Sequence, residues 1–120
     1  MDICITIPKT VAWGEYQKEL DAVKDGTAEL NYRVPFKPNA DTFDRCYLCH
    51  DGEIKGWMYI TRVAHREGFT CTVTGKYWPD SWYVARSGSF HELKNKPKLK
   101  GFRGIRYVNE EFKRKYNLYE

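Results

Sequence analysis

The stretch 43–63, FDRCYLCHDGEIKGWMYITRV, decides the fold of this chain. It contains two runs in which apolar and polar residues alternate, 43–49 and 54–63, joined by His50-Asp51-Gly52-Glu53. An Asp-Gly pair between two such runs is a strong signal for a β-hairpin, because its turn twists in the same sense as the paired strands. We therefore predict an antiparallel pair of strands in the middle of the chain.

Further strands and two helices are predicted on both sides of this hairpin. Trp13, Tyr16, Leu20 and Val23 form one apolar stripe of the first helix, and Asn109 caps a second helix over 110–116. The expected fold is one mixed α/β (α+β) domain over residues 1–120, a small, mostly antiparallel β-barrel with a helix after its first strand and a helix at its C-terminus. The other expected strands are 3–7, 30–35, 69–74, 82–86, 90–93 and 104–108, of which 82–86 and 90–93 are expected to pair around Ser87-Gly88-Ser89.

The composition is that of a soluble globular domain, with 42% hydrophobic and 30% charged residues. No apolar run approaches the ~18 residues of a membrane span, and the N-terminus lacks the pattern of a signal peptide. The four cysteines are too few for a disulfide scaffold, so we expect them to be reduced. We expect a cytoplasmic, monomeric protein with no membrane partner.

Charge is distributed unevenly along the chain. Residues 1–60 carry seven basic and ten acidic side chains, whereas residues 61–120 carry thirteen and six. The segment 76–107 holds eight Lys or Arg and seven aromatic residues, with only Asp80 and Glu92 as acids. Fixed cations suit phosphates and flat rings suit unpaired bases, so this pattern is typical of a nucleic-acid surface. The alternative is that the aromatic residues form the core and the lysines an ordinary solvated face.

The candidate nucleic-acid-binding residues are aromatic and basic. The aromatic ones would stack on a base, and the arginines would hold phosphate or a base edge. Lys94, Lys96, Lys98 and Lys100, here called the lysine ridge, occupy every second position and would face one way in an extended segment, either as a phosphate track or as a charged sheet edge that blocks aggregation. The other candidates are Trp57, Trp78, Trp82 and Tyr83 for stacking and Arg33, Arg86, Arg103 and Arg106 for phosphates.

The motif Cys46-Tyr47-Leu48-Cys49-His50 invites a zinc or haem interpretation. Residues three apart on a strand point to opposite faces, so Cys46 and Cys49 should diverge. The remaining cysteines, Cys4 and Cys71, are isolated in the sequence. We expect ordinary strand cysteines and no metal or other cofactor.

The order of these elements resembles the PUA-like superfamily of small β-barrels, which includes the PUA, ASCH and EVE domains. The resemblance rests on the opening ICITIPKTVAWGEYQKEL, the hairpin with Gly56-Trp57, the segment WPDSWYVARSGSF and the closing GFRGIRYV with its helix. It implies RNA binding, or recognition of a modified base in a pocket beside the barrel. The G-x-K-x-x-E-x-R pattern usual in the ASCH branch keeps Gly26 and Arg33 here but lacks the Lys and the Glu, which argues against the amidohydrolase activity attributed to some ASCH proteins.

Three functions follow as hypotheses. The leading one is a non-catalytic nucleic-acid-binding module that stacks an unpaired, flipped or modified base, with RNA favoured over DNA or a free nucleoside. A second is a small hydrolase acting on a modified nucleoside, with Lys76, His91 and Glu92 or Glu29 as its polar groups. A third is a peptide-binding domain. Salt separates them, because phosphate binding weakens steeply with ionic strength.

Overall fold

The structure, a computed structural model, describes residues 1–119 and contains the predicted central hairpin. Strands β3 (Arg45–His50) and β4 (Glu53–Arg66) pair antiparallel on either side of the turn. Asp51 and Gly52 both have positive φ angles, 49° and 76°, as the tightest hairpin turns require. The Asp-Gly signal therefore identified the turn correctly.

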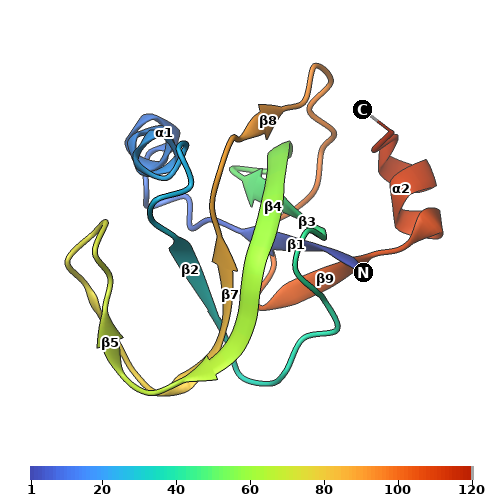
Figure 1. Cartoon of the computed structure of the whole chain (residues 1–120). Coiled ribbons are helices and arrows are strands. Elements are labelled where there is room, and N and C mark those ends of the chain that lie inside the picture. Colours follow the sequence, from blue (N-terminus) through green and yellow to red (C-terminus); the bar gives the residue numbers. More distant parts are fainter. Residues whose placement is uncertain (120) are drawn as a thin grey trace.

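The hairpin lies at the centre of a mixed, mostly antiparallel sheet with the strand order β2-β7-β4-β3-β1-β9 (Figure 1). All neighbours on this path are antiparallel except β1 and β3, which run parallel. The further strands are β1 (Asp2–Thr6), β2 (Leu30–Val34), β7 (Ser81–Arg86), β8 (His91–Glu92) and β9 (Ile105–Val108).

Strands β7 and β8 do not pair with each other, although the sequence predicted that they would. Both pair antiparallel with β4, β7 with its second half and β8 with Gly56 and Trp57. The intervening segment is fixed to the chain between helix α1 (Trp13–Ala22) and β2, because the Ser87 hydroxyl donates to the Ala28 carbonyl (2.6 Å) and the Gly88 amide to that of Val23 (2.9 Å). These bonds keep the chain running along β4 instead of reversing it.

A closed barrel is not found within residues 1–119, because no ladder joins the edge strands β2 and β9. The two edges are linked instead by a side chain. The hydroxyl of Tyr32, on β2, donates to the carbonyl of Gly104, just before β9, at 2.9 Å. The sheet is therefore curved enough for its edges to approach but remains open.

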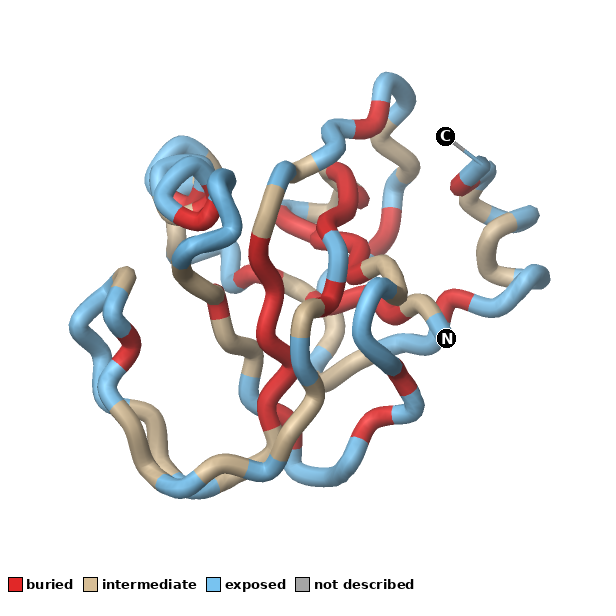
Figure 2. Tube along the Cα trace, viewed as in Figure 1, coloured by how far each residue is buried: buried red, intermediate tan, exposed pale blue. Residues whose placement is uncertain are grey.

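The sheet has an apolar core on each face, and each core is covered by one helix. Tyr16 and Leu20 of α1 pack with Ile5, Met58 and Ile60 on one face, all of them buried. Helix α2 (Glu110–Tyr116) covers the other face. Figure 1 shows the two helices on opposite sides of the sheet, and Figure 2 shows buried residues concentrated between them.

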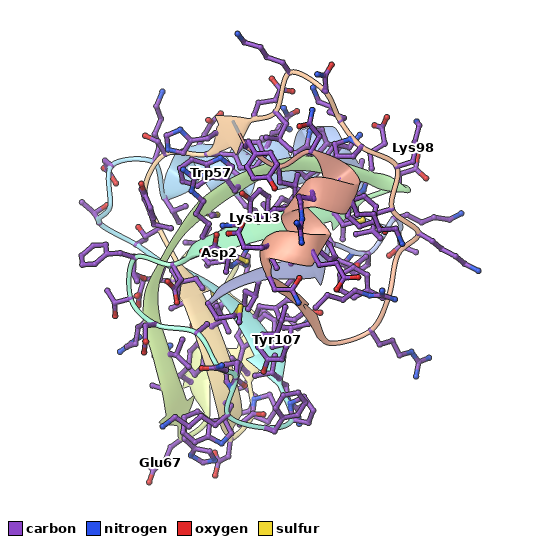
Figure 3. The ribbon with its side chains drawn as sticks, turned by 90° about the vertical axis from the view of Figure 1, so that its right-hand side faces the viewer. Asp2, Trp57, Glu67, Lys98, Tyr107 and Lys113 are labelled. Carbon is purple, nitrogen blue, oxygen red and sulfur yellow. The ribbon has the colours of Figure 1, made fainter. Side chains whose placement is uncertain are left out.

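Helix α2 begins as the sequence predicts, since the Asn109 side chain accepts a hydrogen bond from the Phe112 amide at 2.9 Å. An ion pair between Lys113 and Asp2 of β1 (3.3 Å) fastens the helix to the sheet, and both residues lie close together in Figure 3. Neither helix in the described part of the chain is long and apolar enough to cross a membrane.

A second, two-stranded sheet stands apart from the main one. Its strands β5 (Phe69–Thr70) and β6 (Tyr77–Trp78) form a hairpin between β4 and β7. The sequence predicts a single strand over 69–74, but only its first two residues are extended. Figure 1 shows this hairpin curving away from the main sheet and back toward α1.

Candidate functional site

A cavity of about 510 Å³ opens between α1, β2 and the β5–β6 hairpin. Its walls come from four parts of the chain that are distant in sequence, and most of its surface is apolar. It is lined by Ile7, Pro8, Val11, Tyr16, Glu19, Leu30, Asn31, Tyr32, Arg33, Cys71, Thr74, Lys76, Trp78 and Arg86.

Arg86 at the end of β7 is the largest fully buried side chain of the described residues, with 2% of its surface exposed. Its Nη1 donates to the Tyr16 hydroxyl at 2.9 Å, while its Nε has no hydrogen-bond partner among residues 1–119. No carboxylate of the described chain forms an ion pair with it. Burying a charge that forms no ion pair costs several kcal/mol, so the position of Arg86 favours a functional over a structural role.

Glu19 faces the same cavity from α1, one turn after Tyr16. Burial raises the pKa of its carboxyl group, and the nearby positive charge of Arg86 opposes this rise. The two groups influence each other but are not joined by an ion pair in the part of the chain that the structure describes. The cavity thus presents both a hydrogen-bond donor and an acceptor.

Aromatic rings form much of the remaining wall. Trp78 is held edge-on against Tyr83, with 5.9 Å between ring centroids, and the ammonium group of Lys76 lies 4.5 Å from the Trp78 ring. The indole Nε1 of Trp78 is buried and has no partner within residues 1–119. Tyr32 contributes a second ring, whose hydroxyl is occupied by Gly104. Such rings can hold a flat heteroaromatic ligand.

Two exposed cations and one buried thiol also line the cavity. Arg33 and Lys76 both line it and both are exposed. Cys71 lines it as well but is 5% exposed. Burial raises the pKa of the Cys71 thiol, but hydrogen bonds from Thr74 and Val73 together outweigh it, so the pKa lies below its ordinary value.

The structure brings three of the predicted nucleic-acid-binding residues to this cavity, Arg33, Trp78 and Arg86. The other predicted aromatic residues lie elsewhere. Trp57 is on the face of β4 opposite Met58, as its alternation predicts, but only 6% of it is exposed. Arg45 covers one side of its ring (3.8 Å) and His91 stacks on it (4.1 Å between centroids), so neither ring face is open to a base.

Trp82 and Tyr83 do not line the cavity and contact other parts of the chain. Trp82 is half-buried, with His65 edge-on to its ring and Lys37 at 5.9 Å. Tyr83 is 1% exposed and donates to the Pro79 carbonyl. It anchors the β5–β6 hairpin and therefore positions Trp78 rather than facing the cavity itself.

The lysine ridge, Arg103 and Arg106 do not line the cavity. Within the lysine ridge, Lys96 pairs with Glu92 (3.3 Å) and Lys98 with Glu53 (2.9 Å), while Lys100 is exposed. Arg103 and Arg106 are exposed too, and Arg106 lies over the ring of Phe102 at 4.8 Å. Figure 3 places Lys98 and Glu67, where the β5–β6 hairpin departs, at opposite ends of the molecule.

The residues of the hydrolase hypothesis are dispersed. Lys76 lines the cavity, whereas His91 stacks on Trp57 and Glu92 pairs with Lys96. Glu29 accepts hydrogen bonds from Thr61 (2.7 Å) and Arg62 (2.8 Å). The structure does not assemble them as one group.

The cysteine motif diverges as predicted, since Cys46 packs in the core under α1 and Cys49 in the core under α2. His50 of the same motif lies at the predicted turn but is buried, with its Nε2 2.7 Å from the Val11 carbonyl oxygen. Among residues 1–119 no group of three or more His, Cys, Asp or Glu side chains is placed to hold a metal ion. The expectation of no cofactor remains a prediction.

Sequence reasoning missed Tyr16, Glu19 and Tyr32 as cavity residues. Tyr16 belongs to the apolar stripe of α1, which indicates burial but not a cavity. Glu19 carries no local signal at all, because a Glu on a helix is normally a solvated surface residue. Only the tertiary structure brings them opposite Arg86.

Comparisons of the chain with models of protein families, with curated proteins and with solved structures gave no match. The cavity is lined by apolar and aromatic side chains, a buried guanidinium, a nearby carboxyl group and two exposed cations.

Proposed function

We propose that this chain is a nucleic-acid-binding module that holds an unpaired or flipped base in the cavity between α1, β2 and the β5–β6 hairpin. The observation that carries the proposal is the fully buried Arg86, which forms no ion pair within residues 1–119, at a cavity walled by aromatic rings. A ligand that offers acceptor atoms to this guanidinium would offset the cost of its burial.

The size and lining of the cavity suit a nucleoside. A volume of about 510 Å³ lies in the range of small-molecule sites, which are mostly apolar with a few placed polar groups. Trp78 supplies a ring for stacking, which contributes about 1–3 kcal/mol per base in single-strand binders. A base within a duplex cannot use such a ring, so the partner is single-stranded or has its base flipped out.

The exposed cations Arg33 and Lys76 would hold the phosphates next to the bound base. RNA is the expected partner, because sequence-specific RNA recognition mostly uses unpaired bases. The order of elements supports a distant PUA-like relationship, in which the open sheet would correspond to the barrel. We further propose that the protein acts as a monomer in the cytoplasm.

Two tryptophans offer a matched test of the cavity. Trp78 and Trp82 are both half-buried and both have a lysine near the ring, but only Trp78 lines the cavity. Titrations of single-stranded RNA, single-stranded DNA and duplex should show that Trp78→Ala weakens single-strand binding by about 5- to 150-fold, whereas Trp82→Ala does not. Equal effects of both variants, or no binding of any nucleic acid near 100 mM salt, would remove the proposal.

The salt dependence of binding locates the phosphate contacts. Each phosphate contact that is lost lowers the slope of log K against log salt by about 0.7–0.9. Arg33→Ala and Lys76→Ala should each lower the slope, whereas Lys98→Ala should leave it nearly unchanged because Lys98 does not line the cavity and pairs with Glu53. The reverse result would move the phosphate track to the lysine ridge.

A further inference from the structure

Arg86 and Glu19 give the cavity opposite hydrogen-bonding characters at two neighbouring positions. The guanidinium and the Tyr16 hydroxyl that it contacts can donate to a ligand, while the Glu19 carboxylate can only accept. Since no ion pair joins Arg86 and Glu19 in the described chain, each keeps hydrogen-bonding capacity for a ligand placed between them.

The presence of Glu19 argues against a phosphate or carboxylate as the group bound at Arg86. Such an anion would lie close to a second carboxylate in a poorly solvated site, where like charges repel strongly. Most of the cavity wall is apolar and aromatic, which also suits a neutral, flat ring better than a hydrated anion. The polar edge of a neutral heterocycle therefore suits Arg86 better than an anion.

The four common bases differ in the order of their donors and acceptors. Guanine has two adjacent acceptors, O6 and N7, and next to them two donors, N1–H and the 2-amino group. Adenine places its amino group beside N7 and would present a donor to the guanidinium. Uracil has one N–H between two carbonyls, so one carbonyl would face the carboxylate, and cytosine has an amino group in place of the keto oxygen.

We infer that the base recognised in this cavity is guanine, with Arg86 donating to its O6 and N7 and Glu19 accepting from its N1–H and 2-amino group. This assignment rests on the proposed function and specifies its ligand. Arginine bound to O6 and N7 is the commonest base-specific contact of proteins with nucleic acids. Trp78 and Tyr32 hold the purine ring. The 2-amino group of guanine needs a hydrogen-bond acceptor, which Glu19 provides.

The test uses the full chain and four five-nucleotide RNAs that have uracil at every position except the middle one. The middle base is guanine, hypoxanthine, adenine or uracil, and affinities are measured by fluorescence anisotropy. Guanine should bind about 5- to 150-fold more tightly than adenine, and hypoxanthine, which lacks the 2-amino group, should lie between them.

The variant Glu19→Ala isolates the carboxylate. In this variant the guanine and hypoxanthine RNAs should bind about equally, and both more weakly than to the wild type, because the N1–H of both bases and the 2-amino group of guanine lose their acceptor. Glu15→Ala is the matched control, since Glu15 lies on the same helix but is exposed and paired with Lys18 at 3.1 Å. The control should keep the difference between guanine and hypoxanthine.

Equal binding of the four RNAs would overturn the guanine assignment while leaving the base-binding function in place. If Glu19→Ala still bound the guanine RNA more tightly than the hypoxanthine RNA by the wild-type factor, the role of the carboxylate would be overturned. If no RNA binds, the proposed function fails. Saturation-transfer NMR with free guanosine and adenosine then decides the assignment separately, since a signal for guanosine alone supports it and any other result overturns it.

Discussion

Replacing Arg86 with Met tests whether this side chain serves ligand binding or holds the fold together. The guanidinium is 2% exposed, donates one hydrogen bond to Tyr16 and forms no ion pair with a carboxylate of residues 1–119. Removing a charge of this kind from water costs several kcal/mol when it forms no ion pair. Met keeps an unbranched, flexible stem, ends before the position of the guanidinium, and removes this cost.

The hydrogen bond to Tyr16 offsets part of the gain. Its loss costs about 1 kcal/mol, and the Tyr16 hydroxyl left without its partner costs about 1–3 kcal/mol more. Arg86→Met should therefore lie within about 2 kcal/mol of the wild type in free energy of unfolding. The double variant Tyr16→Phe/Arg86→Met removes the orphaned hydroxyl and should be more stable than the wild type by about 1–4 kcal/mol.

Urea denaturation of the wild type, both single variants and the double variant measures these differences. Tyr16→Phe alone should be less stable by about 1–3 kcal/mol, because it takes away the hydrogen-bond partner that the buried guanidinium has within residues 1–119. Arg86→Met should also lose the preference for guanine-containing RNA while it remains folded. A double variant that is less stable than the wild type by more than about 2 kcal/mol would refute the reasoning, since the guanidinium would then stabilise the core.

Three further predictions concern other parts of the chain. Gly56→Ala should lower the free energy of unfolding by about 1–3 kcal/mol in urea titrations, because a Cβ there would overlap the backbone of β8. Gly14→Ala in α1, where space is open, should raise the free energy of unfolding by about 0.5–1 kcal/mol. Similar effects of the two variants would contradict this prediction. Iodoacetamide followed by mass spectrometry should label Cys71 before Cys46, since burial raises the pKa of Cys46 to about 12 while hydrogen bonds hold that of Cys71 below its ordinary value; equal rates would argue against it. Hydrogen bonds and charges from Lys55 and Lys98 lower the pKa of Glu53 from 4.5 to about 2, so its contribution to stability is complete above pH 4.5 and is lost as the pH falls toward 2. Glu53→Gln should lack this loss, and parallel stability curves for the variant and the wild type would be the opposite result.

Local signals in the sequence predict the elements of the fold well. The β3–β4 turn follows from Asp51-Gly52, whose left-handed backbone any Asp-Gly turn favours. The cap of α2 follows from Asn109, and the divergence of Cys46 and Cys49 follows from the alternation of a strand. Each of these depends on residues within a few positions of one another.

Pairings between distant segments are not encoded so locally. The strands β7 and β8 look like a hairpin around Gly88, but bonds from that segment to Val23 and Ala28 direct both strands along β4. Whether the sheet closes depends on the approach of β2 and β9, which a hydrogen bond from Tyr32 joins in place of a ladder within residues 1–119.

The candidate site shows the same limit. The interleaved aromatic and basic residues of 76–107 correctly draw attention to Trp78 and Arg86, but they also include Trp82 and the lysine ridge, which lie elsewhere. Glu19 could not be identified from the sequence, because its importance comes from lining the same cavity as Arg86. No residue near Glu19 in the sequence indicates this proximity. The alternation that places Trp57 opposite Met58 is right, yet it does not reveal that Arg45 and His91 cover both sides of the ring.

The β5–β6 hairpin, which stands apart from the main sheet in Figure 1, has an evolutionary consequence. It is anchored by Phe69 and Trp78 against Tyr83, while Thr74 and Lys76 line the cavity and are exposed. Mutations at these two positions can accumulate without disturbing either core, so ligand preference can drift between descendants while the folded scaffold is conserved. Gene duplicates would be expected to diverge first in this hairpin and last in β1, β3 and β4.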